Sequence, residues 1–315
     1  MNFNLTKRAK PLAAAVAGLA LAVSAPTAMA GAQAYANISF SNFLYQDVSN
    51  GSVLELGNDV AVTNLLDQTQ HTVTRFVGPG AGVDASAASD TDVTDSILLD
   101  PRMACVGPGC GAGTAVENTF VRGDFNTEEY NRADSFGAGS GLDLTSVGGA
   151  VDPSAATFLA EAVTQAGATD AASSRFNATV AFSITPTNDL VLGLDFDAIT
   201  DLFVGLHADA NGSAIAQVNF DISLSRQDTG EEIDILGNLN VLDEIISVNG
   251  DGPNDDTGGQ AVAISLQTAS ALLAGVTYDL AYSFSATADL TATKQVPEPS
   301  ALALLGLGLL GVSFA

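Results

Sequence analysis

Hydrophobic and polar residues alternate along several stretches in the second half of the chain. In FNATVAFSIT (residues 176–185), every second position from Phe176 to Ile184 is apolar, and the positions between are polar apart from one alanine. The segments VNFDISLS (218–225) and YDLAYSFSA (278–286) follow nearly the same pattern. Successive side chains of a strand point to opposite faces of a sheet, so each segment predicts a strand with one buried and one solvated face.

Strands with one solvated face are typical of antiparallel sheets. Together with the turn signals between them, they predict an all-β fold: an antiparallel, jelly-roll-like β-sandwich with one short helix and long Gly- and Asp-rich loops. We expect most of residues 78–149 to form these loops, because alternation is lost there among Gly, Ala, Ser and Asp. The helix is expected at 152–166, where Asp152 serves as N-cap and Pro153 takes the first helical position.

The start of the chain has the features of a secretory signal peptide. These are a basic beginning, an apolar stretch and small residues before the expected cleavage site, namely Lys7, Arg8, Lys10, Leu12–Val23 and Ala28. The pattern predicts passage through the export machinery and cleavage after Ala30, because the apolar stretch is too short for a transmembrane helix of about 20 residues. The chain then divides into a signal peptide (1–30), an exported sandwich domain (31–293) and a tail (294–315).

Acidic residues dominate the exported part. The chain has 36 Asp and Glu against 10 Lys and Arg, and all the acidic residues follow Ala30. Such a surface repels phosphate, so the composition excludes nucleic-acid binding. Lys294 is the only lysine after the signal peptide. The expected domain therefore lacks the lysine that a phosphate-binding loop or lysine-dependent catalysis requires. Neither His71 nor His207 begins a zinc-protease motif, and we expect a non-enzymatic protein.

Cys105 and Cys110 enclose Val-Gly-Pro-Gly. In an exported chain this spacing predicts a disulfide, because the turn is able to bring the two Cα atoms to the separation of about 5.5 Å that a bridge requires. The alternative, a zinc site, needs two further ligands, and the chain offers two histidines besides its carboxylates.

Two acidic segments are candidates for calcium binding, the one cofactor that we consider. NGDGPNDDTGG (249–259) supplies Asp251, Asn254, Asp255 and Asp256, and SDTDVTD (89–95) supplies Asp90, Asp92 and Asp95. Calcium takes six to eight oxygen ligands in irregular geometry, although neither segment has EF-hand spacing. Asp195 and Asp197 in LDFD point the same way from one predicted strand, which suits calcium or an acid–base pair. In so acidic a chain, solvated charge is the commoner role of such residues.

The last twenty residues, VPEPSALALLGLGLLGVSFA, place Pro297, Glu298 and Pro299 before an uncharged apolar stretch. They resemble the PEP-CTERM sorting signal of Gram-negative bacteria, in which Pro-Glu-Pro precedes a short transmembrane helix and a basic cluster. The resemblance implies a transmembrane helix at 302–314, brief anchoring in the inner membrane and processing by an exosortase. The printed sequence has no counterpart of the basic cluster. Residues 300–315 would span about 24 Å as a helix, against about 30 Å of hydrocarbon.

The resemblance also implies association with exopolysaccharide and biofilm, so our first hypothesis is a non-enzymatic surface or extracellular-matrix protein. A second hypothesis is a calcium-assisted carbohydrate-binding or ice-binding module. The chain contains no Trp, the usual platform for stacking sugars, and shows no regular threonine ladder, and both absences weaken this hypothesis. A third is a secreted hydrolase that uses the carboxylate pair Asp195 and Asp197.

Overall fold

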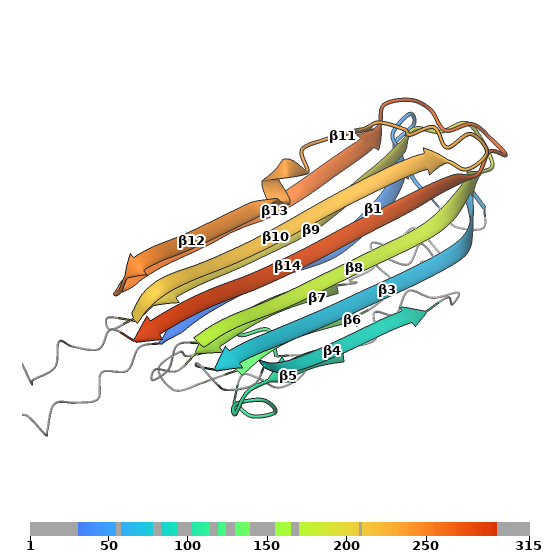
Figure 1. Cartoon of the computed structure of the whole chain (residues 1–315). Coiled ribbons are helices and arrows are strands. Elements are labelled where there is room, and N and C mark those ends of the chain that lie inside the picture. The colour runs from blue at the N-terminus through green and yellow to red at the C-terminus, as the bar shows by residue number, and fades with distance from the viewer. Residues whose placement is uncertain are drawn as a thin grey trace, which may run out of the picture.

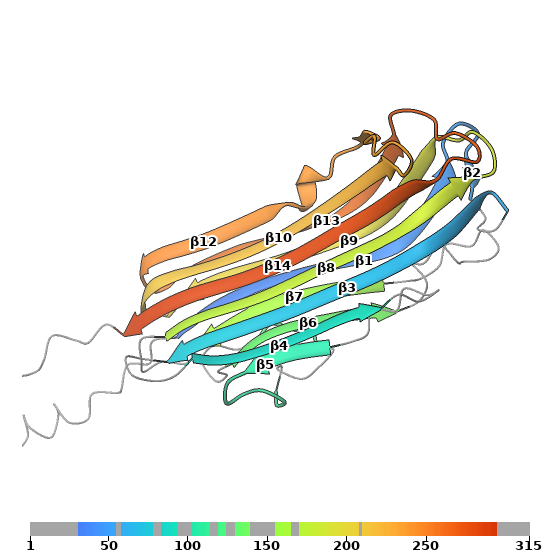
Figure 2. The same ribbon diagram turned by 45° about the vertical axis from the view of Figure 1, so that its right-hand side comes forward.

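The computed structural model describes residues 31–54, 58–77, 83–92, 102–113, 119–123, 130–138, 155–164, 170–207 and 210–294. Within them the chain forms two antiparallel β-sheets packed face to face as an elongated sandwich, whose strands run along its long axis (Figures 1 and 2). The predicted all-β sandwich is confirmed. Among the described residues the only helical element is the short 3-10 turn Asn240–Leu242.

One sheet has eight strands and the other has six. The eight-stranded sheet runs in the spatial order β11 (Ile235–Leu236), β13 (Asn254–Thr268), β9 (Leu192–Leu206), β1 (Ala32–Asp47), β7 (Ala155–Thr164), β6 (Tyr130–Ala138) and β5 (Arg102–Val106), with β2 (Ser52–Val53) paired to β1. The six-stranded sheet runs in the order β12 (Glu244–Asp251), β10 (Ala210–Arg226), β14 (Tyr278–Lys294), β8 (Asp170–Pro186), β3 (Val60–Val77) and β4 (Val83–Asp92).

The three segments with the clearest alternation lie side by side as β10, β14 and β8 of the six-stranded sheet. Their apolar residues face the core, where Phe220 and Phe284 are opposite each other in register. Phe40 of β1, in the other sheet, contacts both rings with centroid separations of 5.1 Å. Because a buried aromatic ring removes a large apolar area from water, this cluster holds the two sheets together.

The helix expected at 152–166 is wrong, because Ala155–Thr164 form strand β7. Both faces of β7 are buried: Phe158 contributes to the core, whereas Leu159 packs with Tyr35 on the opposite face. A strand buried on both faces shows no alternation, so its apolar run has the same pattern as a helix. These residues form a strand rather than a helix because they pair with β1 on one side and with β6 on the other.

The prediction of loops over 78–149 is also wrong in part, because strands β4, β5 and β6 lie within this range. The sequence did not predict β6, because most of its buried residues are polar and do not alternate with apolar ones. Arg132 meets a buried carboxylate, and Ser135 lies 3.1 Å from Nε2 of His71, so these polar groups have partners inside the fold. The remainder of 78–149 lies mostly outside the described residues.

The two ends of the sandwich domain lie at the same end of the molecule. Ala32 is opposite Leu206, and Ala210 is opposite Lys294, the last residue of β14. The described residues contain no helix that is long and apolar enough to cross a membrane. The signal peptide and the predicted tail helix lie outside the described residues.

Candidate functional site

A buried ion pair lies on the outer face of the eight-stranded sheet. Arg132 of β6 and Glu161 of β7 are opposite each other in register, both side chains are 0% exposed, and Nε lies 2.9 Å from Oε2. Glu161 also accepts hydrogen bonds from the Gln33 side chain, the Tyr130 hydroxyl and the Gly123 N–H at 2.8–2.9 Å. A buried charge is tolerated only with such partners, so the pair has a structural role.

The ion pair fastens residues 119–123, which we call the strap, over the outer face of this sheet. The guanidinium of Arg132 donates to the carbonyl oxygens of Thr119 and Val121. The Tyr35 hydroxyl donates to the Phe120 carbonyl at 2.8 Å, and burial of Tyr35 raises its pKa well above the usual range. The strap explains why β7 is buried on both faces.

Cys105 and Cys110 form a disulfide with a Cα–Cα separation of 5.9 Å. The bridge joins the end of β5 to the turn that follows, and it packs against Tyr130 and Val163. It therefore closes the same outer surface that the strap covers.

The predicted calcium segment 249–259 is a tight strand connection rather than an open loop. Asp251 ends β12, and Asn254, Asp255 and Asp256 begin β13, where they pair with β9. Among the described residues, no group of three or more His, Cys, Asp or Glu side chains is placed to hold a metal ion. Asp90 and Asp92 lie on β4, whereas their side chains and Asp95 lie outside the described part of the chain.

Asp195 and Asp197 lie on the outer face of β9, and each is hydrogen-bonded to an amide of β1. Gln46 donates to Asp195 at 2.9 Å, and Asn42 donates to Asp197 at 2.6 Å. Asn42 has a φ of 58°, a left-handed conformation that Asn tolerates, and it occupies an irregularity in the β1–β9 register between Ser41 and Leu44.

The outer face of the six-stranded sheet carries short polar side chains. One row crosses four adjacent strands, from Asn219 through Ser285 and Asn177 to Gln70, and the next contains Gln217, Thr287 and Thr72 beside Arg175. Asn219 donates to Ser285 at 3.1 Å and accepts from Gln217 at 3.0 Å. We call these eight residues the hydroxyl–amide face; it presents donors and acceptors at regular strand spacing with one charged group.

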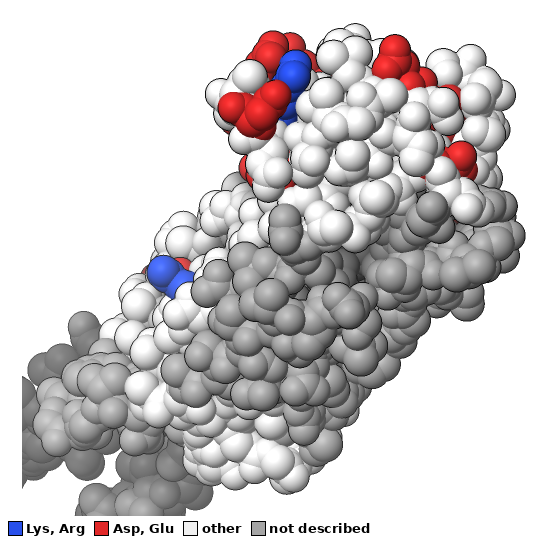
Figure 3. Space-filling model, turned by 90° about the vertical axis from the view of Figure 1, so that its right-hand side faces the viewer, with Lys and Arg blue, Asp and Glu red and all other residues white. Residues whose placement is uncertain are grey.

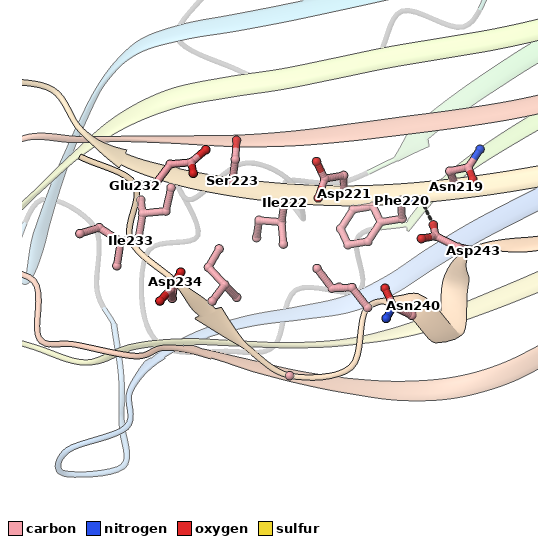
Figure 4. Close-up of a pocket in the computed structure, with 14 residues that line it drawn as sticks. Asn219, Phe220, Asp221, Ile222, Ser223, Glu232, Ile233, Asp234, Asn240 and Asp243 are labelled. Atoms are coloured by element: carbon pink, nitrogen blue, oxygen red, sulfur yellow. Dashed lines mark hydrogen bonds between the residues drawn. The ribbon is translucent and has the colours of Figure 1, made fainter. Parts of the chain in front are cut away.

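A pocket of about 510 Å³ opens beside β10, and we call it the edge pocket (Figure 4). It exists because β12 pairs with β10 only as far as Val218, opposite Glu244. The preceding strand β11 belongs to the other sheet, so residues 232–243 must cross between the sheets and bow away from β10. Gly237 has a φ of 144°, and a Cβ there would lie 2.3 Å from Leu266 Cδ2, so only glycine suits this crossing.

Polar and apolar groups share the lining of the edge pocket. The carboxylates are Asp221, Glu232, Asp234 and Asp243, the amides are Asn219 and Asn240, and the apolar side chains include Ile222, Leu224, Ile233, Ile235 and Leu239. Among the described residues that line it, none is Lys, Arg or His. Among the described residues in view at the end where β8 and β10 terminate, acidic side chains cluster and basic ones are few (Figure 3).

Comparison with known proteins adds one finding. Residues 295–315 match the family model described as the PEP-CTERM protein-sorting motif. The chain carries a PEP-CTERM sorting motif. No curated protein and no solved structure matches the chain significantly. The PEP-CTERM motif marks an exported protein that is sorted to the cell surface and processed by an exosortase.

The PEP-CTERM motif begins directly after Lys294, where β14 ends. Its predicted recognition residues Pro297, Glu298 and Pro299, like the predicted cleavage site after Ala30, lie outside the described residues. The edge pocket and the Arg132–Glu161 pair were not predicted from the sequence. The acidic run at Glu231–Asp234 after a clear strand was the one signal near the pocket.

Proposed function

We propose that this PEP-CTERM protein is a non-enzymatic component of the cell surface or extracellular matrix that contacts exopolysaccharide through its hydroxyl–amide face. In this proposal the tail holds the protein briefly in the inner membrane until an exosortase processes it. The supporting observation is the composition of the face. Rows such as Asn219, Ser285, Asn177 and Gln70 offer neutral donors and acceptors to the hydroxyl groups of a polymer.

The surroundings of the carboxylate pair favour a non-enzymatic role. A general acid or base needs a position inside a cleft, within reach of a bound substrate. Asp195 and Asp197 instead lie on an outer sheet face, and each already accepts a hydrogen bond from a side-chain amide. A secreted hydrolase that uses this pair is therefore the weaker hypothesis.

The test is co-sedimentation of the exported protein with insoluble exopolysaccharide from the producing cells. The double variant Gln70→Ala with Asn177→Ala removes two neighbouring exposed amides of the hydroxyl–amide face. Each lost hydrogen bond weakens binding by about 0.5–1.5 kcal/mol, so the double variant is expected to bind at least about fivefold more weakly. The matched control, Ser265→Ala with Gln267→Ala, changes exposed residues of the other sheet and is expected to bind like the parent.

Equal retention of both variants would contradict a role for this face. Release of soluble sugar by the parent, abolished by Asp195→Asn with Asp197→Asn, would replace the proposal with the hydrolase hypothesis.

A further inference from the structure

We propose that the edge pocket is a specific binding site for an amine-bearing sugar unit, such as a glucosamine residue at the end or in a branch of a polysaccharide. This site adjoins the hydroxyl–amide face, with which it shares Asn219, and the proposal holds whether or not that face binds a polymer. Its volume of about 510 Å³ lies within the range of about 300–1,000 Å³ that is common for small-molecule sites.

The first argument concerns the backbone N–H and C=O of Ile222, which face the pocket. Phe220 donates its N–H to Asp243 Oδ1 at 3.1 Å, and Leu224 accepts from the Ile233 N–H at 2.8 Å. Backbone groups of alternate residues point to the same side of a strand, so the N–H and C=O of Ile222 point to this side as well. No hydrogen bond from the described residues is found to them, which leaves one donor and one acceptor for a ligand.

The second argument concerns the shape of the ligand. An unpaired strand edge is able to accept an extended peptide as an added strand. Here the crossing segment contacts β10 at both ends of the pocket, at Phe220 and at Leu224. These residues are four strand positions apart, which is about 13 Å at 3.3–3.4 Å per residue. A compact ligand fits between the two contacts, whereas a continuous strand would be blocked.

The third argument concerns the chemistry of the lining. The Asn219 and Asn240 amides supply hydrogen-bond donors and acceptors for hydroxyl groups, and the apolar side chains between them, among them Ile222, suit the C–H face of a sugar ring (Figure 4). Acidic side chains with no basic lining residue favour a cationic ligand and exclude acidic sugars. An ammonium group on a polyhydroxylated body meets all of these conditions.

The test is calorimetric titration and amide NMR of the mature exported protein at physiological ionic strength with three probes. These are the disaccharide of glucosamine, its neutral N-acetylated counterpart and 1,4-diaminobutane. We expect the glucosamine disaccharide to bind about tenfold more tightly than either of the others, because only it combines the ammonium group with the hydroxyl groups. We also expect it to shift the amide signals of Phe220, Ile222 and Leu224.

The variant Glu232→Gln with Asp234→Asn neutralises two pocket carboxylates, and we expect it to bind the disaccharide about fivefold to tenfold more weakly. The loss is modest because these side chains are exposed. The matched control, Asp201→Asn with Glu231→Gln, changes the net charge equally at exposed residues outside the lining, and we expect binding within about twofold of the parent.

Three results would each overturn the proposal. The first is that the glucosamine disaccharide does not bind at millimolar concentration, and the second is that 1,4-diaminobutane binds as tightly as the disaccharide. The third is that the control variant loses as much affinity as Glu232→Gln with Asp234→Asn, because equal losses indicate general attraction to an acidic surface.

Discussion

Replacement of Arg132 by Met tests whether the buried ion pair holds the strap on the eight-stranded sheet. Methionine keeps an unbranched apolar stem and removes the guanidinium. The Glu161 carboxylate then stays buried without a positive charge beside it, and the carbonyl oxygens of Thr119 and Val121 lose their donor. The backbone of β6 is unaffected, because its pairing with β5 and β7 does not involve the side chain.

The expected cost follows from burial. Both side chains of the pair are 0% exposed, and removal of one partner from such a pair costs about 3–5 kcal/mol. That loss is a large share of the total stability of about 5–15 kcal/mol that native proteins have. The surface pair of Arg226 and Asp228, at 2.7 Å, is a matched control: Asp228 is 59% exposed, so Arg226→Met should cost far less stability than Arg132→Met.

A double variant separates the ion pair from packing. Glu161→Gln removes the charge and keeps Oε1 as the acceptor for Gln33 and Gly123, while the new NH2 group takes the place of Oε2 and is able to donate to the Tyr130 hydroxyl. When both charges are absent, no buried charge is left unpaired, so Arg132→Met with Glu161→Gln should be less destabilised than the sum of the single variants by more than about 1 kcal/mol.

The assay is urea unfolding followed by far-ultraviolet circular dichroism, combined with hydrogen exchange of the strap amides. Arg132→Met should lower the unfolding midpoint and speed exchange at residues 119–123. The reasoning is refuted if Arg132→Met costs no more than Arg226→Met, or if the double variant shows strictly additive losses.

Two further predictions concern the core. Phe40→Ala should cost about 3–5 kcal/mol in urea unfolding, because Phe40 contacts rings from both sheets; a loss no larger than that of Phe40→Leu would contradict this. Burial raises the pKa of Tyr282 well above its ordinary 10.0, so the folded protein keeps a proton that the unfolded chain releases. The stability from Tyr282 should therefore be complete below pH 10 and fall above it, and the tyrosinate absorbance that Tyr282→Phe removes should appear only together with unfolding.

Alternation predicts a strand well where one face meets the core and the other meets water. β8, β10 and β14 satisfy this condition along most of their length, and the sequence shows it. β7 fails the condition because the strap and the ion pair cover its outer face. The cover comes from residues that are distant along the chain, such as Arg132 and Phe120, so no local pattern around Phe158 or Leu159 reveals it.

The edge pocket depends on pairing choices that local sequence does not encode. Ile235 and Leu236 join β13, whereas Glu244 and the residues after it join β10 on the opposite sheet. The segment between these two pairings leaves the edge of β10, and the space beside that edge is the pocket. Glu232 and Asp234 belong to a short acidic run in the sequence, but only the fold shows that they share a position beside β10.

The PEP-CTERM motif is joined to one end of the sandwich. β14 ends at Lys294 and the motif follows directly, so any tether through the tail acts on one end of the sandwich. The edge pocket lies beside β10 residues 219–224, which pair with β14 from Ser285 to Leu280. Ser285 is nine strand positions from Lys294, so at about 3.4 Å per residue the pocket stands about 30 Å or more from the tether. In the proposed tail-anchored form, the edge pocket therefore lies toward the opposite end of β14 from the tether, where an extracellular polymer is able to reach it.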